Sequence, residues 1–190
     1  MLSDIPKTIL LLGVPLVWWF AATKGNVSFF EYVGLKKVRV THELFATTII
    51  LTIVFVKIIM PSLYYRLIPE LFAQSSSLDS PGIWVLAYVI LVHPIFLTGF
   101  LEEVAFRGFL GKRLIAKFGF AVGNTMQAAI FGLGHNVPGL SLTSAVSLVI
   151  ITGTFGWIAG YITEKQAGGS ITPAWILHAF ANSPFFIMRL

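Results

Sequence analysis

Residues 83–103 read IWVLAYVILVHPIFLTGFLEE, and this stretch indicates what kind of fold the chain adopts. About twenty mostly apolar residues lead into two adjacent carboxylates, Glu102 and Glu103, and such a run is long enough to cross a bilayer as a helix. His93-Pro94 interrupts the run, and proline disturbs a helix interior. The stretch therefore predicts a membrane span that ends at Leu101 and is followed by acidic residues.

The composition extends this interpretation to the whole chain. Of its 190 residues, 56% are hydrophobic and only 11% are charged, against about 45–50% and 25% in ordinary globular proteins. The mean hydropathy is +0.86. These values exclude a disordered chain, speak against a water-soluble enzyme and indicate a polytopic membrane protein. The absence of cysteine excludes disulfides, a thiolate nucleophile and a Cys-ligated metal.

Apolar stretches separated by Pro, Gly and charged residues predict an all-α transmembrane bundle with about six spans and a polar intramembrane catalytic cavity. The expected spans are residues 9–22, 44–60, 83–101, 118–135, 142–162 and 171–188. The first follows Lys7, as the apolar part of a signal peptide follows a basic residue. Pro15, Trp18 and Trp19 and the lack of a clear cleavage site favour a retained helix instead.

Three connecting stretches have their own character. Residues 29–40 mix aromatic and basic side chains, which is typical of an amphipathic segment at the membrane interface. Tyr64, Tyr65 and Arg66 suit an interfacial belt, and residues 74–81 form a Ser-rich loop.

The net charge of +5 comes from basic residues in the connections rather than along one face, which favours a membrane-flanking role over nucleic-acid binding. Most of them lie in the first, third and fifth connections: Lys24, Lys36, Lys37, Arg39, Lys112, Arg113, Lys117 and Lys165. With six spans, the positive-inside rule predicts that these connections are cytoplasmic and that both termini lie outside.

Ionisable side chains inside apolar helices need a partner or a function. Glu103 and Arg107 are four residues apart with the acid first, which is the favourable order for an ion pair on one helical face. A structural ion pair accounts for both of these residues. It leaves Glu102 without a partner.

Two histidines and one asparagine are the other candidates. His135 ends the fourth span, where a lone histidine is usually a cap or an interfacial residue. His178 and Asn182 are four residues apart in the sixth span and share a helical face, an arrangement equally typical of an interhelical hydrogen bond. Antiparallel packing of a helix that begins near Glu102 against one that ends at His135 would bring all these groups into one bundle.

Such a set of side chains supports two kinds of chemistry. It can deprotonate a water molecule and stabilise an oxyanion. Glu102, His135 and His178 also suit a zinc ion, although the short motif H-E-x-x-H is absent. No G-x-S-x-G frame marks a serine nucleophile, and no Gly-rich phosphate loop is present.

Three motifs carry a resemblance to a known family. EEVAFRGFL, residues 102–110, resembles the E-E-x-x-x-R motif of the CPBP family, the CAAX-processing and bacteriocin-processing intramembrane proteases also called the Abi family. Phe131–His135 resembles its F-x-x-x-H motif and His178–Asn182 its H-x-x-x-N/D motif, in the same order. The resemblance covers about residues 81–186, and within the family the chain is similar to the type II CAAX prenyl endopeptidases. We therefore expect N-terminal membrane helices over residues 1–80 and a protease core over residues 81–190.

The resemblance implies roles for the site residues. Glu102 and His135 would hold and activate the attacking water, and His178 and Asn182 would stabilise the oxyanion of the intermediate. Glu103 and Arg107 would orient or brace the site. His93 lies outside the motifs, and we expect it to be structural.

The resemblance also implies a membrane-embedded peptidase without a cofactor, in a prokaryotic plasma membrane. Its expected partners are membrane lipids and a peptide or lipidated protein substrate, held at the bilayer by its anchor; nucleic acid is not expected. Two alternatives stay open: a zinc endopeptidase that uses Glu102, His135 and His178 as ligands, and a non-catalytic immunity or partner protein. The lack of a visible inverted repeat disfavours a transporter.

Overall fold

The computed structural model describes residues 4–62, 68, 82–135 and 137–187, and these residues contain helices and no strand. Two predicted features, the belt at Tyr64–Arg66 and the loop at residues 74–81, lie outside this set. Residues 80 and 81, between which the domain boundary is expected, also lie outside the described residues. The helices are α1 (Asp4–Thr23), α2 (Phe29–Tyr32), α3 (His42–Val54), η1 (Phe55–Ile59), α4 (Met60–Ser62), α6 (Ile83–Ala87), η3 (Tyr88–Phe100), η4 (Glu103–Gly111), α7 (Lys112–Phe118), α8 (Phe120–Leu133), α9 (Leu142–Tyr161), η5 (Ile162–Gln166) and α10 (Thr172–Ile187); η marks π-helical turns.

One continuous helix, made of α6, η3, η4 and α7, runs past the predicted end at Leu101 to Phe118. The prediction of a span that ends at Leu101 and a new helix near Glu102 is therefore wrong. Pro94 lies inside the helix and has no backbone N–H to donate. The wider π-helical turns around it accommodate the missing hydrogen bond. Thr98 Oγ1 also donates to the carbonyl oxygens of His93 and Pro94, at 3.1 and 3.3 Å. The helix thus carries Glu102 in its interior.

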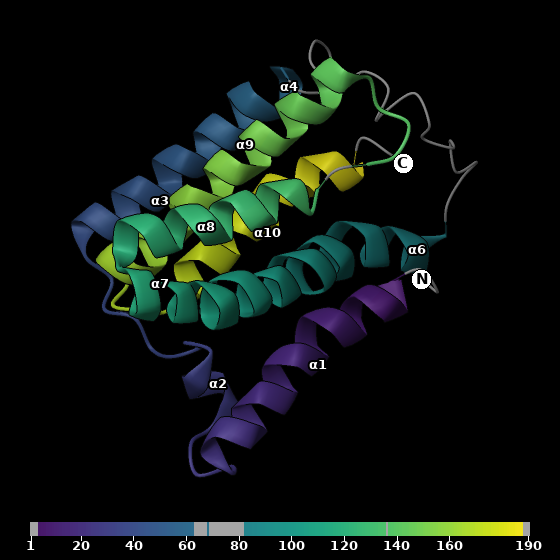
Figure 1. Ribbon diagram of the computed structural model, residues 1–190. Helices are drawn as coiled ribbons and strands as arrows, with labels where there is room; N and C mark the ends of the chain where they lie inside the picture. Colours follow the sequence, from purple (N-terminus) through teal and green to yellow (C-terminus); the bar gives the residue numbers. More distant parts are fainter. Residues whose placement is uncertain (1–3, 63–67, 69–81, 136, 188–190) are drawn as a thin grey trace.

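Gly119 ends this helix and starts the return of the chain. Its φ of 77° lies in the left-handed region, which glycine adopts without steric penalty. α8 follows at once and packs antiparallel to α7 (Figure 1). The predicted start of a span at residue 118 is therefore close to the observed turn.

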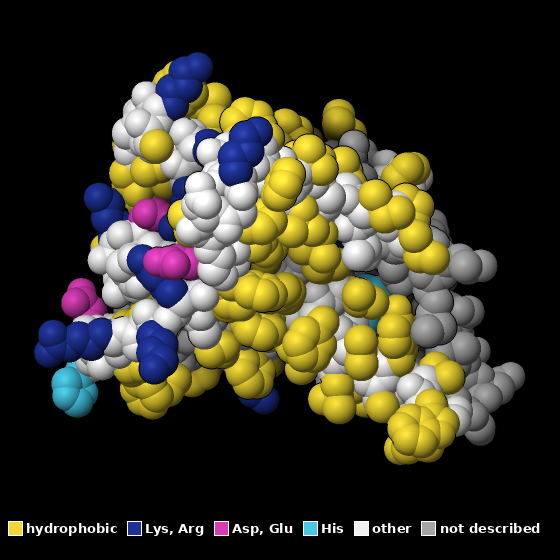
Figure 2. Space-filling model, turned by 90° about the horizontal axis from the view of Figure 1, so that it is seen from below, with side chains coloured by type: hydrophobic (Ala, Val, Ile, Leu, Met, Phe, Trp, Pro, Cys, Tyr) yellow, Lys and Arg dark blue, Asp and Glu magenta, His cyan; other side chains and the backbone are white. Residues whose placement is uncertain are grey.

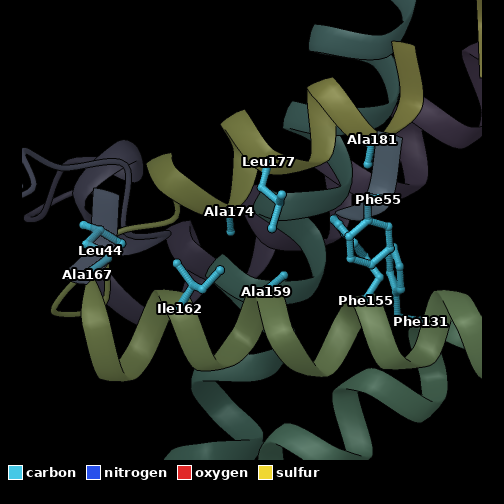
Figure 3. Packing of buried hydrophobic residues seen from close by; sticks show 10 residues of the cluster. All are labelled: Leu44, Phe55, Phe131, Phe155, Ala159, Ile162, Ala167, Ala174, Leu177 and Ala181. Carbon is cyan, nitrogen blue, oxygen red and sulfur yellow. The ribbon is translucent and has the colours of Figure 1, made fainter. Parts of the chain in front are cut away.

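The other helices lie on both sides of the long helix (Figure 1). α3, α8, α9 and α10 form a group on one side, while α1 crosses the other side. Figure 3 shows the side chains of α10 pointing toward those of α9 and η5 in the largest buried cluster. Its members include Phe131, Phe155 and Leu177 together with Ala159, Ala174 and Ala181. Small residues of this kind let membrane helices approach closely.

The described residues include four helices that are long and apolar enough to cross a membrane: Ile5–Thr23, His42–Ile59, Ile83–Leu133 and Leu142–Gln166. The third of these contains the turn at Gly119, and α10 has only 16 residues. The described residues are therefore those of a helical integral membrane protein. The count of six spans stays a prediction.

The segment predicted to be amphipathic, residues 29–40, is helical only in α2 within the part that the structure describes. Val33 is fully buried against Val104 and Ile171, and the Gly34 carbonyl accepts a hydrogen bond from Ile171 N at 3.0 Å. The segment is therefore anchored to the bundle, while Lys36, Lys37 and Arg39 stay exposed. Its position at the membrane interface stays a prediction.

Candidate active site

The long helix and the ends of two other helices hold the predicted site residues. Glu102 lies between η3 and η4, and Glu103 and Arg107 belong to η4. His135 follows α8, and His178 and Asn182 lie on α10. Five of these six side chains, all except Asn182, are joined by contacts that centre on the two carboxylates.

Glu102 faces both imidazoles with one of its carboxylate oxygens. Its Oε2 atom lies 3.6 Å from His135 Nε2 and 3.7 Å from His178 Nε2. These separations are longer than direct hydrogen bonds. Glu102 is only 4% exposed, and its Oε2 is buried without a hydrogen bond in the structure. A buried carboxylate oxygen of this kind needs a donor.

The other nitrogen of each imidazole fixes its tautomer. His135 Nδ1 lies 2.7 Å from the Phe131 carbonyl oxygen, and His178 Nδ1 lies 2.7 Å from Glu103 Oε1. Both oxygens only accept hydrogen bonds, so both Nδ1 atoms carry the proton. In the neutral rings each Nε2 therefore presents a lone pair beside Glu102 Oε2. Three acceptors converge where a water molecule would supply the hydrogens.

Glu103 braces the site through two partners. Its Oε1 atom is 3.0 Å from Arg107 Nη1 as well as 2.7 Å from His178 Nδ1. Both Glu103 and Arg107 have fully buried side chains. The Arg107 guanidinium lies over the Phe131 ring, 4.2 Å from its centroid, and 5.7 Å from the centroid of Phe155. The predicted ion pair is therefore present and also orients His178.

Asn182 lies one turn beyond His178 on α10 but has a different partner. Its Nδ2 atom donates a hydrogen bond to Thr98 Oγ1 at 3.0 Å. Thr98 in turn donates to the carbonyl oxygens beside Pro94. The proline in the long helix thus positions Asn182 through Thr98, a link that the sequence analysis missed.

Lys7, interpreted from the sequence only as the basic flank of an apolar run, is a further partner of Glu102. Lys7 Nζ on α1 donates to Glu102 Oε1 at 2.5 Å. The one available signal was that Glu102 had no partner. With Lys7 and Arg107 as cations and two carboxylates, the fixed charges of the site cancel when both imidazoles are neutral.

His135 lies beyond the end of α8 and has a perturbed proton affinity. Burial lowers the pKa of its imidazole, and this outweighs the opposite effect of the Glu102 carboxylate. Its ring also packs on the Phe131 ring, with centroids 4.4 Å apart. A neutral His135, whose Nε2 can accept a hydrogen bond, is therefore favoured near neutral pH.

His93 lies on the same long helix and has a different neighbour. The Tyr88 ring packs edge-on against its imidazole with centroids 5.8 Å apart. This contact agrees with the structural role expected for it. Among the described residues, no three His, Asp or Glu side chains form a group placed to hold a metal ion.

Comparison with family models identifies the chain. Residues 81–184 match the model described as type II CAAX prenyl endopeptidase Rce1-like. The chain belongs to this family. Comparisons with curated proteins and with solved structures gave no match.

This membership confirms the resemblance to the CPBP proteases that the three motifs indicated. The Rce1-like family is a family of proteases, so its match supports a hydrolase embedded in the membrane. The matched region contains all six predicted site residues and leaves out Lys7. The division at residue 80 stays a prediction.

Proposed function

We propose that the chain is a glutamate-dependent, metal-independent intramembrane endopeptidase that cleaves membrane-anchored peptides. The observation that carries the proposal is the convergence of Glu102 Oε2 with the Nε2 atoms of His135 and His178, at 3.6 and 3.7 Å. A water molecule there can donate one hydrogen to the carboxylate and one to an imidazole.

The proposed reaction begins when Glu102 takes a proton from this water. The water oxygen attacks the carbonyl carbon of the scissile peptide bond, and the negative charge moves to the carbonyl oxygen. Collapse of this tetrahedral intermediate breaks the C–N bond, and the leaving amine receives the proton from Glu102. His135 holds the water by accepting its other hydrogen.

His178 and Asn182 are proposed to stabilise the oxyanion. The His178 Nδ1 proton already faces Glu103, so Nε2 can donate only when the ring is protonated on both nitrogens. Asn182 Nδ2 would exchange its Thr98 partner for the oxyanion. Each donor of this kind is worth about 100- to 1000-fold in rate.

Cleavage of a prenylated peptide by the purified protein tests the proposal. We expect Glu102→Gln and His135→Ala to abolish turnover, while Glu164→Gln, which removes a partly exposed carboxylate paired with Lys112, keeps it. Unchanged turnover in the Glu102 and His135 variants would sink the assignment. If Glu102→Gln also retained the full cellular phenotype, a non-catalytic partner role would be favoured.

Zinc hydrolysis is the second candidate, because Glu102, His135 and His178 are a familiar zinc-ligand set. Each histidine has its Nδ1 hydrogen-bonded to an acceptor, as metal-bound histidines usually do. A zinc ion held by these residues would lower the pKa of a bound water. The metal-free form is proposed first because the short zinc motif H-E-x-x-H is absent and a Glu, two His and an Asn suit water activation at least as well. Stoichiometric zinc in active protein, with activity lost to a chelator and restored by zinc, would reverse that order.

The substrate is proposed to be a peptide or lipidated protein held at the bilayer of a prokaryotic plasma membrane, with membrane lipids as the surrounding partner. A single lipid chain binds a membrane with only about 10⁴ M⁻¹, yet it concentrates the peptide near a site between membrane helices. We therefore expect a higher kcat/KM for a lipidated peptide than for the same peptide without its lipid. Equal values in both detergent and liposomes would refute the dependence on an anchor.

A further inference from the structure

The N-terminal helix reaches the proposed catalytic carboxylate from outside the region that defines the family. Lys7 on α1 donates a hydrogen bond to Glu102 Oε1 across 95 positions of sequence, at 2.5 Å. Its side chain is 45% exposed, while that of Glu102 is 6% exposed. A half-exposed ammonium thus covers one side of a buried acid.

The two oxygens of Glu102 consequently have different surroundings. Oε1 is engaged by Lys7, and Oε2 faces the two imidazoles without a hydrogen bond in the structure. The terminal torsion of a glutamate is broad and poorly restrained by itself. A charge-assisted hydrogen bond is roughly twice as strong as a neutral one. Lys7 therefore fixes the rotation that aims Oε2 at the water position.

Lys7 also provides the positive charge that pairs with the Glu102 carboxylate. Arg107 pairs with Glu103, and Lys7 is the one lysine or arginine among the described residues that forms an ion pair with Glu102. A buried charge without a partner is strongly unfavourable. Without Lys7, the partners left to Glu102 in ion pairs among the described residues are the two imidazoles, which carry a charge only when protonated.

We propose that Lys7 is a positioning residue for peptide hydrolysis, which makes α1 part of the active site. This inference rests on the proposed function, in which Glu102 is the base. Lys7 touches Glu102 and acts on the reaction through it.

The docking of α1 does not depend on Lys7 alone, so a variant at this position can keep its fold. The Trp18 ring packs edge-on against Phe109 of η4 with centroids 6.0 Å apart. Leu12 packs with the cluster of Val33, Val104 and Ile171. These contacts hold α1 against the long helix on either side of its midpoint.

The kinetic test uses the full chain in detergent and a fluorescence-quenched prenylated peptide. We expect Lys7→Met to lower kcat by up to about 100-fold, as small misplacements of catalytic groups do, with KM little changed. Lys7→Arg should recover most of the loss because it keeps the cation. Lys24→Met, which removes a lysine just beyond the other end of α1, should behave as wild type.

A second measurement reads the contact without any catalysis. A membrane-permeable carbodiimide should couple Lys7 to Glu102 directly, and mass spectrometry should detect the joined peptides in wild type and not in Lys7→Met. No such link in the wild type would overturn the inference.

The remaining outcomes also decide the matter. Wild-type kcat in Lys7→Met, or an arginine variant as slow as the methionine variant, overturns the role of Lys7 while the proposed function stands. A wild-type chain that cleaves no anchored peptide overturns the proposed function together with the role built on it, even if the link forms.

Discussion

At the scale of single residues, two neighbouring glutamates have separate surroundings. Glu103 is fully buried and bound to Arg107 and His178, whereas Glu102 keeps one oxygen free of hydrogen bonds and facing two imidazoles. Adjacent residues on a helix point about 100° apart, which lets one carboxylate serve the architecture and the other the water. The proposed reaction depends on this division.

Replacing Glu103 should therefore damage stability as well as rate. Glu103→Gln keeps the shape but leaves the buried Arg107 charge unpaired, and breaking a buried pair costs about 3–5 kcal/mol. The matched control, Glu164→Gln, breaks the partly exposed pair with Lys112, which is worth about 0–1 kcal/mol. Unfolding midpoints in detergent measure both. Equal shifts in the two variants would contradict the bracing role.

The pH dependence follows from His135. Because burial lowers the pKa of its imidazole below the usual 6.5, Nε2 stays unprotonated as the pH falls to that value. Protonation at lower pH removes the lone pair that accepts from water. We expect kcat/KM to hold from neutral pH to about 6.5 and to fall only at lower pH. A wild-type loss centred above 6.5 would count against this assignment.

At this scale the sequence predicted one local contact and missed the contacts between distant residues. The ion pair of Glu103 and Arg107 followed from i, i+4 spacing, and the structure confirms it. The contact of Lys7 with Glu102 spans 95 positions, and no local spacing rule reaches that far. The bond of Asn182 to Thr98 depends on which face of α10 meets η3, which only packing decides.

At the scale of helices, close packing of α8 against α9 sets the position of His135. A Cβ at Gly132 would lie 2.6 Å from the Val149 carbonyl oxygen and 3.1 Å from Gly153 Cα, both on α9. Neither is the flexible end of a side chain. The two helices would have to move apart to admit even one methyl group.

Gly132→Ala should consequently lower both stability and rate. Overpacking of this kind costs about 1–3 kcal/mol, and the shift of α8 should move His135, three residues further on. Gly13→Ala is the matched control, because its Cβ would meet nothing closer than Ile9 Cγ2 at 4.0 Å and alanine favours a helix. Thermal unfolding and kcat measure the pair of variants. A Gly132→Ala protein as stable and active as Gly13→Ala would show that α8 and α9 separate freely.

The helix boundaries mark where local rules stop working. Five of the predicted spans overlap α1, α3, α8, α9 and α10 at nearly their observed positions, because apolar length alone identifies such segments. The span predicted to end at Leu101 continues instead through Glu102 and Glu103. Charged residues usually mark the point where an apolar helix leaves the membrane. Here the two carboxylates are paired inside the bundle instead, with Lys7, Arg107 and His178. Their partners lie on other helices and cannot be found by reading along the chain.

At the scale of the whole molecule, the basic connections gather at one end of the bundle. The turn after α1, α7 with Gly119 and the η5–α10 connection lie together at that end (Figure 1). In Figure 2 most Lys and Arg side chains cluster there, while hydrophobic side chains cover much of the remaining face. The folded arrangement thus brings the residues 24–39, 112–117 and 165 onto one side. The positive-inside rule predicts that the side of a membrane protein with this excess of Lys and Arg faces the cytoplasm.

Membrane orientation can be tested directly because the chain has no cysteine of its own. Asn26→Cys lies exposed in the first connection and leaves every lysine and arginine in place, and Val137→Cys lies exposed in the connection after α8. These two connections lie at opposite ends of the bundle (Figure 1). With the basic end in the cytoplasm, an impermeant maleimide added to intact cells should label position 137 alone. Position 26 should react only after the membrane is opened, because the cationic connections are held on the inner side. Labelling of position 26 on intact cells, with position 137 protected, would reverse the orientation. Labelling of both positions on intact cells would mean that the two ends do not lie on opposite sides of one bilayer.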